Sequence, residues 1–264
     1  MSGAAGRVQS SGAGERAGAR RLGLPRVHLR VTGSTNERAR ALALAGAPHG
    51  TLVSAGEQTA GRGRNGRSWV APAGSALLVS LLLRSPPRLL PLSAAVAVCD
   101  VAGAQAAIKW PNDVVVTGAD GALAKLAGIL VEGRPQQDWA VLGIGVNAAV
   151  QLEQLPPELR QGGAPHGEGS ALPAATLGLA RGELEPTLAR LTGALERRLA
   201  QDAAATLAAW RRKDALRGRE VAWSGGRGRA DGIDGSGRLI VSLARGGSTA
   251  LASGEVQLLA IGGA

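Results

Sequence analysis

The chain has 264 residues, 40 of them glycine, and its 30 Lys and Arg residues outnumber its 20 Asp and Glu residues, giving a formal net charge of +10. This length suits one sizeable α/β or α+β domain with a small additional module. No apolar run reaches the roughly 18 residues of a membrane-spanning helix, and the N-terminus lacks the apolar stretch of a signal peptide, so we exclude membrane and secreted proteins and expect a cytoplasmic one.

The first part of the chain predicts a tail followed by a helix. Residues 1–24 are rich in Gly, Ala, Ser and Arg without an apolar period, which is typical of a disordered tail. Apolar residues at helical spacing then predict a helix from Asn36 to Gly46, with Ser34, Thr35 or Asn36 as its N-cap. Capping alone is one interpretation of this Ser-Thr-Asn triplet.

A long loop is expected from Gln58 to Pro72, between strands at Thr51–Ala55 and Ser75–Leu83. Its central residues are Gly61, Arg62, Gly63, Arg64, Asn65, Gly66, Arg67, Ser68 and Trp69. Glycine permits close backbone approach, so that N–H groups can form a nest around an anion. A guanidinium is a planar fork that matches phosphate oxygens, and an indole ring can cover a base. The loop therefore predicts a site for a triphosphate and a purine.

The segment from Gly61 to Gly66 also matches the dinucleotide-binding motif G-x-G-x-x-G. That motif requires a helix directly after the glycines and an acidic residue about 20 positions further along the chain. Here an apolar β-like run follows Pro72, and the next acidic residue is Asp100. We therefore exclude a dinucleotide fold. A solvated Arg-Gly loop without a ligand stays open as the alternative.

The remaining chain predicts a sheet, a long helix and a small β module. An apolar helix is expected at Leu92–Ala104, and an amphipathic helix at Glu185–Arg211 with Pro186 in its first turn. From Gly218, short β segments alternate with Gly-rich turns. The strands expected between the two helices are Ala107–Trp110, Val114–Thr117, Ala127–Glu132 and Trp139–Val146, with a turn near residues 118–121.

Rare residue types cluster in a few segments. Only three lysines and four asparagines are present, and tyrosine and phenylalanine are absent. A residue retained against such a bias towards Arg, Ala and Gly indicates a chemical role. The clusters are Ser34-Thr35-Asn36, Asn65 in the arginine loop, Lys109-Trp110-Pro111-Asn112-Asp113, Lys125-Leu126-Ala127-Gly128-Ile129-Leu130 and Gly143-Ile144-Gly145-Val146-Asn147.

With these clusters and the Gln58-Thr59-Ala60 segment before the arginine loop, the sequence resembles the biotin protein ligases from about Val27 to the C-terminus. The resemblance implies an α+β fold, with a mixed β-sheet catalytic domain flanked by helices at residues 25–214 and a small SH3-like β-barrel at 215–264. It implies a form without an N-terminal DNA-binding domain, because a tail at residues 1–24 is too short to form one. Specific DNA binding is therefore not expected, and the chain is expected to be a monomer or a weak homodimer.

The resemblance also implies the reaction. Biotin and ATP, with Mg²⁺, would give biotinyl-5′-adenylate, and a lysine of a biotin carboxyl carrier protein would then attack it. The residues implied to bind biotin are Ser34, Thr35, Asn36, Gln58, Arg62, Gly63, Arg64 and Lys125. The residues implied to bind ATP or the adenylate are Gly61, Arg62, Arg64, Arg67, Trp69, Asn112, Lys125 and Asn147. The residues implied to be catalytic are Lys125, Arg64, Lys109 and Asp113.

Several alternatives stay open at this point. Lys109 and Asp113 could form only a structural ion pair, and Gly143 and Gly145 could mark ordinary strand irregularity rather than close packing of the strand against a ligand. A lipoate or octanoate transferase and a non-catalytic Arg-rich binding module are the competing functions. Cysteine chemistry is not expected, because the single Cys99 lies in an apolar run.

No protein-bound metal site is predicted either. His28, His49 and His166 lack acidic or cysteine partners at metal-ligand spacing. A serine hydrolase is excluded, because the sequence contains no Gly-x-Ser-x-Gly elbow.

Overall fold

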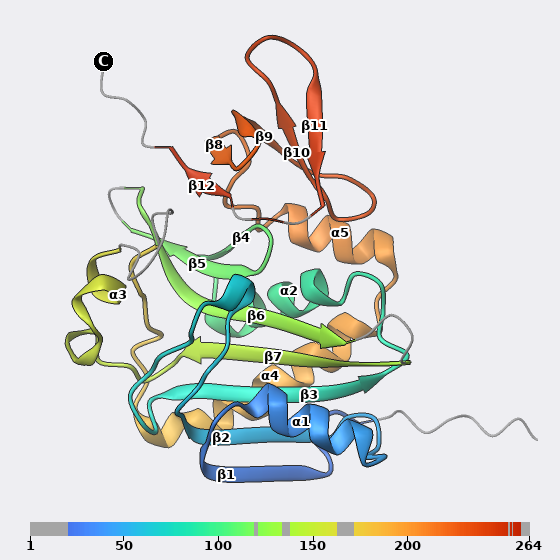
Figure 1. Ribbon diagram of the computed structural model, residues 1–264, viewed down its shortest axis with the longest axis vertical. Helices are drawn as coiled ribbons and strands as arrows, with labels where there is room; N and C mark the ends of the chain where they lie inside the picture. The colour runs from blue at the N-terminus through green and yellow to red at the C-terminus, as the bar shows by residue number, and fades with distance from the viewer. Residues whose placement is uncertain are drawn as a thin grey trace, which may run out of the picture.

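The computed structural model describes residues 21–118, 121–133, 138–162, 172–252, 254 and 256–259. Two sheets organise these residues (Figure 1). The large sheet contains β1 (Arg26–Thr32), β2 (Leu52–Gln58), β3 (Ala76–Arg84), β4 (Ala106–Lys109), β5 (Asp113–Thr117), β6 (Leu123–Gly133) and β7 (Trp139–Asn147). Its order is β1-β2-β3-β7-β6-β5-β4, and only the pair of β1 and β2 is parallel. The α+β class and the mixed sheet are thus as predicted.

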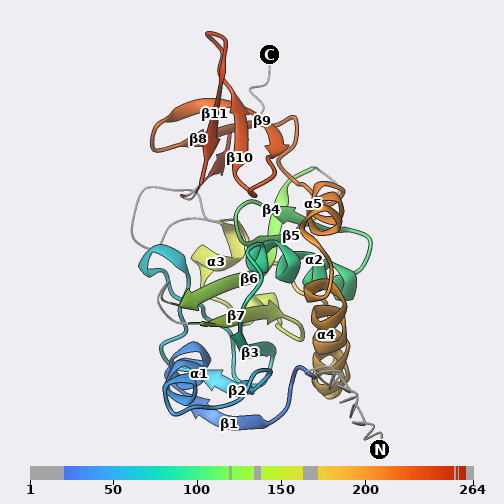
Figure 2. The ribbon, with the colours of Figure 1, turned by 90° about the vertical axis from the view of Figure 1, so that its right-hand side faces the viewer.

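Helices cover both faces of the large sheet. The helices are α1 (Thr35–Leu44), α2 (Leu90–Ala102), the short α3 (Pro157–Gln161), α4 (Leu184–Leu199) and α5 (Ala203–Arg211). Figure 2 shows α2, α4 and α5 on one side of the sheet and α1 on the other. None of the helices in the described ranges combines the length and apolarity needed to span a bilayer.

This two-sided cover explains why β3 is apolar at almost every position. Successive side chains of a strand point to opposite faces, so a strand between two layers buries both sets. Leu77 and Leu81 belong to the core under α2 and α4, whereas Leu82 packs with Ala39 of α1. Ser80, between Leu78 and Leu82 on the α1 face, is the polar exception and is fully buried. A buried hydroxyl needs hydrogen-bond partners, so the burial of Ser80 indicates that other polar groups lie on this face.

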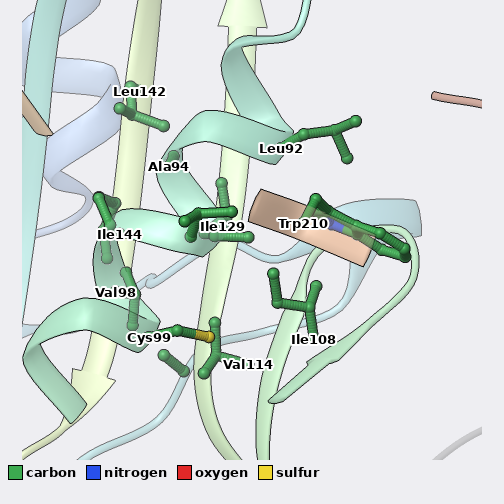
Figure 3. Close-up of a cluster of buried hydrophobic side chains, with 14 of the residues drawn as sticks. Leu92, Ala94, Val98, Cys99, Ile108, Val114, Ile129, Leu142, Ile144 and Trp210 are labelled. Atoms are coloured by element: carbon green, nitrogen blue, oxygen red, sulfur yellow. The ribbon is translucent and has the colours of Figure 1, made fainter. Parts of the chain in front are cut away.

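The main core lies between the large sheet and helices α2, α4 and α5. Figure 3 shows residues of α2, among them Val98 and Cys99, packed against strand residues such as Ile129, with Trp210 of α5 closing one side. Burial raises the pKa of the Cys99 thiol to about 12, so it stays protonated at neutral pH. Cys99 is therefore a small core residue, as predicted, and not a nucleophile.

The second sheet consists of β8 (Glu220–Trp223), β9 (Gly226–Ile233), β10 (Leu239–Ser242), β11 (Ser248–Leu251) and β12 (Gln257–Leu258). Its order is β11-β10-β9-β8-β12, and every pair is antiparallel. The predicted small C-terminal β module is therefore present, but within the described residues β11 and β12 do not pair with each other, so its sheet is not closed into the predicted SH3-like barrel. Trp110 Nε1 donates to the carbonyl of Gly237 at 3.0 Å, which joins this sheet to the β4–β5 turn.

Two further predictions need correction. The long helix expected at Glu185–Arg211 is two helices, because the chain turns at residues 200–202 and Asp202 caps α5 by accepting from Ala205 N at 2.7 Å. Strand β1 was not predicted, since its outward residues such as Arg26 and Arg30 break the apolar pattern. Most of the predicted tail, and residues 119–120 of the predicted turn, lie outside the described residues. The division into domains at residue 214 stays a prediction.

Candidate functional site

A hollow opens on the α1 face of the large sheet, beyond the N-terminus of α1. Residues at the end of β2, at the centres of β6 and β7, in the β4–β5 turn and in the arginine loop line this hollow, and we define the arginine loop as residues 61–69. Three of the β6 and β7 positions that line it are glycine: Gly128, Gly143 and Gly145. Their lack of a Cβ atom lets the Asn36 and Trp69 side chains pack directly against the sheet.

The floor of the cavity is a chain of buried polar side chains. Thr35, through both its backbone N–H and its hydroxyl, donates to Gln58 Oε1 at 2.7 and 2.9 Å. Ser80 Oγ lies 2.8 Å from Thr35 Oγ1 and 2.6 Å from Asn36 Oδ1. Asn36 Nδ2 donates to Glu132 Oε2 at 2.8 Å. Thr35, Asn36 and Ser80 are all at most 5% exposed, so this network holds the floor in one arrangement.

Gly143 is required by this floor. A Cβ atom added at Gly143 would lie 2.1 Å from Asn36 Oδ1, a distance at which the asparagine could not keep its place. Gly143 is therefore packed closely against Asn36, and close packing of the Gly-Ile-Gly segment against a ligand stays a prediction.

The Trp69 ring packs against the sheet at a place where two strand residues are glycine. Gly128 and Gly145 are paired in the β6–β7 register, and Cβ atoms added there would lie 3.0 and 2.6 Å from the indole. Lys125 Nζ stands 5.8 Å from the centroid of the same ring, within range of a cation–π contact. The indole thus forms one side of the cavity beside a lysine ammonium.

The arginine loop folds back on itself. Gly63 N donates to the carbonyl of Arg67 at 2.6 Å, and Trp69 N donates to the carbonyl of Gly61 at 2.9 Å. Between them, Asn65 and Gly66 have positive φ values of 54° and 74°, which produce a tight turn. The Gly63 N–H is therefore used inside the loop in this arrangement, and the nest of glycine N–H groups around an anion stays a prediction.

Charged side chains line the wall opposite the floor. Lys125 Nζ lies 2.7 Å from Asp113 Oδ1 in an ion pair that is not aligned as a hydrogen bond. Lys109 is buried and pairs with Asp113 in the β4–β5 register. Arg64 Nη1 donates to Asn112 Oδ1 at 3.2 Å, and Asn112 Nδ2 donates to the carbonyl of Ile129. The wall therefore gathers positive charge around one carboxylate.

Nearly all the residues predicted from the sequence meet in this cavity. Those that line it are Ser34, Thr35, Asn36, Gln58, Arg62, Gly63, Arg64, Arg67, Trp69, Lys109, Asn112, Asp113 and Lys125. Gly61 lies outside the lining and allows close contact with the Trp69 carbonyl, since a Cβ atom there would approach it to 2.4 Å. Asn147 also lies outside, is buried and donates to the carbonyl of Ala175 at 3.0 Å. It borders a smaller pocket on the other side of Trp69 and Lys125.

Sequence reasoning missed three contributors. Ser80 could have been found as the hydroxyl in an otherwise apolar strand, whereas Glu132 gave no signal, because it lies at the end of a strand where acidic residues are common. Val256 lines the cavity from the C-terminal segment, a long-range approach that local patterns do not contain. No group of three or more His, Cys, Asp or Glu side chains that could hold a metal ion occurs within the described ranges.

Comparison with known proteins agrees with this geometry. Residues 28–148 match the sequence profile of the Biotin/lipoate A/B protein ligase family. The chain is 40% identical over 151 residues to the bifunctional ligase/repressor BirA of Bacillus spizizenii, which is 53% of this chain and 45% of that protein. It is 40% identical over 141 residues to the biotin–[acetyl-CoA-carboxylase] ligase of Mycobacterium tuberculosis, which is 48% of this chain and 50% of that protein. The chain thus spans about half the length of these relatives.

A solved structure is similar over a longer stretch. The biotin protein ligase from Aquifex aeolicus in complex with biotin and ATP superposes with a TM-score of 0.67 at 26% sequence identity. The superposition covers 89% of this chain and 98% of that one, so the similarity in fold extends well beyond residues 28–148.

Proposed function

We propose that the chain attaches biotin to a lysine of a biotin carboxyl carrier protein at the expense of ATP, and the match of residues 28–148 to the Biotin/lipoate A/B protein ligase family supports this proposal. The observation that carries the proposal is the convergence in one cavity of a buried hydrogen-bonding floor, a glycine-lined slot and a cluster of Lys and Arg side chains. Relatives with these activities support the same choice.

The floor suits the polar head of biotin. The ureido ring of biotin carries two N–H donors and one carbonyl acceptor, and the floor presents hydroxyl and amide groups from Ser34, Thr35, Asn36 and Gln58. Thr35, Asn36 and Gln58 are already held in the hydrogen-bonded network, so a ligand meets a preorganised surface and little ordering is needed when it binds. We assign them to biotin recognition.

Lys125 is the central electrostatic group of the proposal. A carboxylate is a poor electrophile, and its attack on the α-phosphorus of ATP brings two anions together. The Lys125 ammonium, set between the Trp69 ring and Asp113, would stabilise the negative charge that develops on the α-phosphoryl oxygens. We propose that the guanidinium groups of Arg62, Arg64 and Arg67 bind the phosphates and that Trp69 lies beside the nucleotide.

The second step needs a deprotonated lysine from the carrier. Free lysine has a pKa of about 10.4 and is mostly protonated at neutral pH, so a nearby carboxylate assists its attack on the adenylate. Asp113 is proposed for this role, and Lys109 and Asn112 hold the turn beside it. Asn147 is proposed to act at the border of the nucleotide site, through the pocket beyond Trp69.

Mg²⁺ is proposed as an ion carried by ATP. Mg²⁺ keeps several waters and binds through substrate phosphates with only one or two carboxylates, so a protein cage of acidic residues is not required. Asp113 is a carboxylate of the cavity wall that could face such an ion. We also propose that the reaction takes place in the cytoplasm.

Pyrophosphate exchange tests the proposal. Adenylate formation is a complete half-reaction, so radioactive pyrophosphate should enter ATP only when biotin and Mg²⁺ are both present. Biotin, lipoate and octanoate are compared in parallel. Exchange with lipoate or octanoate in place of biotin would reassign the substrate, and equal exchange without any acid would contradict an acyl-adenylating function.

A further inference from the structure

Glu132 at the end of β6 touches two separate parts of the site. Its Oε2 accepts from Asn36 Nδ2 at 2.8 Å, and its Oε1 lies 3.3 Å from Arg62 Nη1. The Glu132 side chain is 24% exposed and that of Arg62 is 52% exposed. We propose that Glu132 is a positioning residue, whose single carboxylate ties the hydrogen-bonded floor to the arginine loop. The kinetic part of this inference rests on the function proposed above.

The contact with Asn36 sets the direction of the floor hydrogen bonds. An asparagine amide can present either its oxygen or its NH₂ group to a given neighbour. Turning the Asn36 amide over would place its oxygen against the Glu132 carboxylate, so the NH₂ group must face Glu132 and the oxygen must face Ser80. The Ser80 hydroxyl then donates to Asn36 Oδ1, which accepts only, and the Thr35 hydroxyl donates to Gln58 Oε1. The Leu130 carbonyl, 3.4 Å from Asn36 Nδ2, favours the same orientation of the amide. Glu132 therefore helps to fix the orientation of the Asn36 amide within the floor.

The contact with Arg62 holds the loop near the cavity. Arg62 lies in the arginine loop, which begins just after Gln58 of the floor. Its guanidinium pairs with Glu132 on one side of the opening, and Arg64 reaches Asn112 on the other. An ion pair of this exposure contributes little to global stability but is enough to bias a glycine-rich loop. An incoming phosphate can compete with Glu132 for Arg62, so the pair can exchange when the substrate binds.

Two variants separate these contacts. Glu132→Gln keeps an oxygen that can accept from Asn36 but loses the charge that attracts Arg62. Glu132→Ala loses both contacts. Glu220→Gln, at an exposed position of β8 in the second sheet, removes the same charge from a residue that does not line the cavity and is the matched control. Thermal unfolding of each variant checks the fold, and the nearly isosteric Glu132→Gln keeps the proposal testable if Glu132→Ala is unstable.

Limited trypsin digestion tests the loop contact without any ligand. The arginine loop contains cleavage sites after Arg62, Arg64 and Arg67, and Arg245 in the turn after β10 is an exposed reference site. Loss of the pair should increase the rate of cleavage after Arg64 and Arg67 about threefold in both Glu132 variants. Cleavage after Arg245, and every rate in Glu220→Gln, should stay unchanged. Equal loop rates in wild type and in both variants would overturn the tie between Glu132 and Arg62.

Steady-state pyrophosphate exchange tests the floor contact. We expect Glu132→Ala to raise the KM for biotin about tenfold with kcat little changed, because an oriented hydrogen bond to a charged group is lost without touching the reacting atoms. Glu132→Gln should raise this KM less than threefold. A fall in kcat alone, or the same KM in both variants, would overturn the role assigned to Glu132 at Asn36. If wild type shows no exchange, the proposed function fails, and the trypsin result still decides the loop contact.

Discussion

The floor and the cover of the cavity are built in opposite ways. The floor residues Thr35, Asn36 and Ser80 are at most 5% exposed and satisfy one another's hydrogen bonds. The cover is a loop of glycine and arginine, and its Arg62 side chain is half exposed. The floor is thus stabilised by the packed sheet, whereas the cover depends on a few side-chain contacts. Changes to the floor should therefore affect ligand affinity and stability together, and changes to the cover should affect retention of the intermediate alone.

Lys125→Ala should have the largest effect, because Lys125 lies between floor and cover and faces the position where charge develops. We expect kcat for biotin-dependent pyrophosphate exchange to fall by about 10²- to 10³-fold, with a much smaller change in the KM for biotin. Lys213→Ala removes the same charge outside the cavity and should retain wild-type kcat. A change in KM with kcat preserved would instead make Lys125 a ground-state binding group.

Gly143→Ala tests the rigidity of the floor. The new Cβ atom would lie 2.1 Å from Asn36 Oδ1, so the asparagine must move and the buried network must break. We expect a loss of stability of about 1–3 kcal/mol, and biotin affinity reduced by at least tenfold, as measured by thermal unfolding and titration calorimetry. Gly182→Ala is the control, because no heavy atom lies within 4 Å of the added Cβ. Undiminished biotin binding in Gly143→Ala would mean that the floor is adaptable.

The same contrast explains what the sequence could predict. Motif residues such as Lys125 and Asn36 were found because rare residue types stood out, and β3 and α2 were found because burial gives strong local patterns. Strand β1 was missed because a half-exposed edge strand has a weak pattern. The split between α4 and α5 was missed because a single cap, Asp202, decides it.

Contacts between distant segments could not be predicted at all. Residues 36, 62 and 132 are brought together only by the strand order of the sheet. The packing of Asn36 on Gly143 and of Trp69 on Gly145 likewise joins segments that are distant in the sequence. Local patterns contain neither kind of information, so the sequence predicted the members of the site better than their mutual contacts.

Arg64→Gly tests the cover. The substitution removes the guanidinium that bonds to Asn112 and adds backbone freedom to the loop, so the reactive adenylate should escape several-fold faster. A free acyl adenylate reacts with accessible amines, and the variant should therefore biotinylate bystander proteins while wild type labels its carrier. Arg217→Gly, at an exposed position outside the motifs, is the charge-matched control. Equal bystander labelling by the two variants, with adenylate formation retained in both, would show that Arg64 does not hold the loop closed.

Asp214, between α5 and β8, provides a contrast with the floor, because this partly buried carboxylate has one buried oxygen without a hydrogen-bond partner. Its Oδ1 accepts from Leu216 N at 2.9 Å, whereas its buried Oδ2 has no partner among the described residues. Burial raises the pKa of Asp214, against the lowering effect of the Leu216 and Arg217 N–H groups and the Arg217 charge. The folded protein therefore binds this proton more tightly than the unfolded chain does. The favourable contribution to stability is complete below the unfolded pKa of about 3.9 and is lost as pH rises through the raised value.

Asp214→Asn should therefore raise Tm by about 2 °C at pH 7, and the gain over wild type should shrink as pH falls towards 4. Asp234 is the natural contrast. Burial opposes its ionisation, but N–H and hydroxyl groups of Arg238 and Ser236 and the Arg238 guanidinium outweigh burial and hold the pKa of Asp234 below its usual range. Asp234→Asn should therefore lower Tm at pH 7, and its deficit should shrink at acidic pH. If both variants shift Tm in the same direction at pH 7, hydrogen-bond satisfaction does not separate these two partly buried carboxylates, and the contrast drawn between them loses its support.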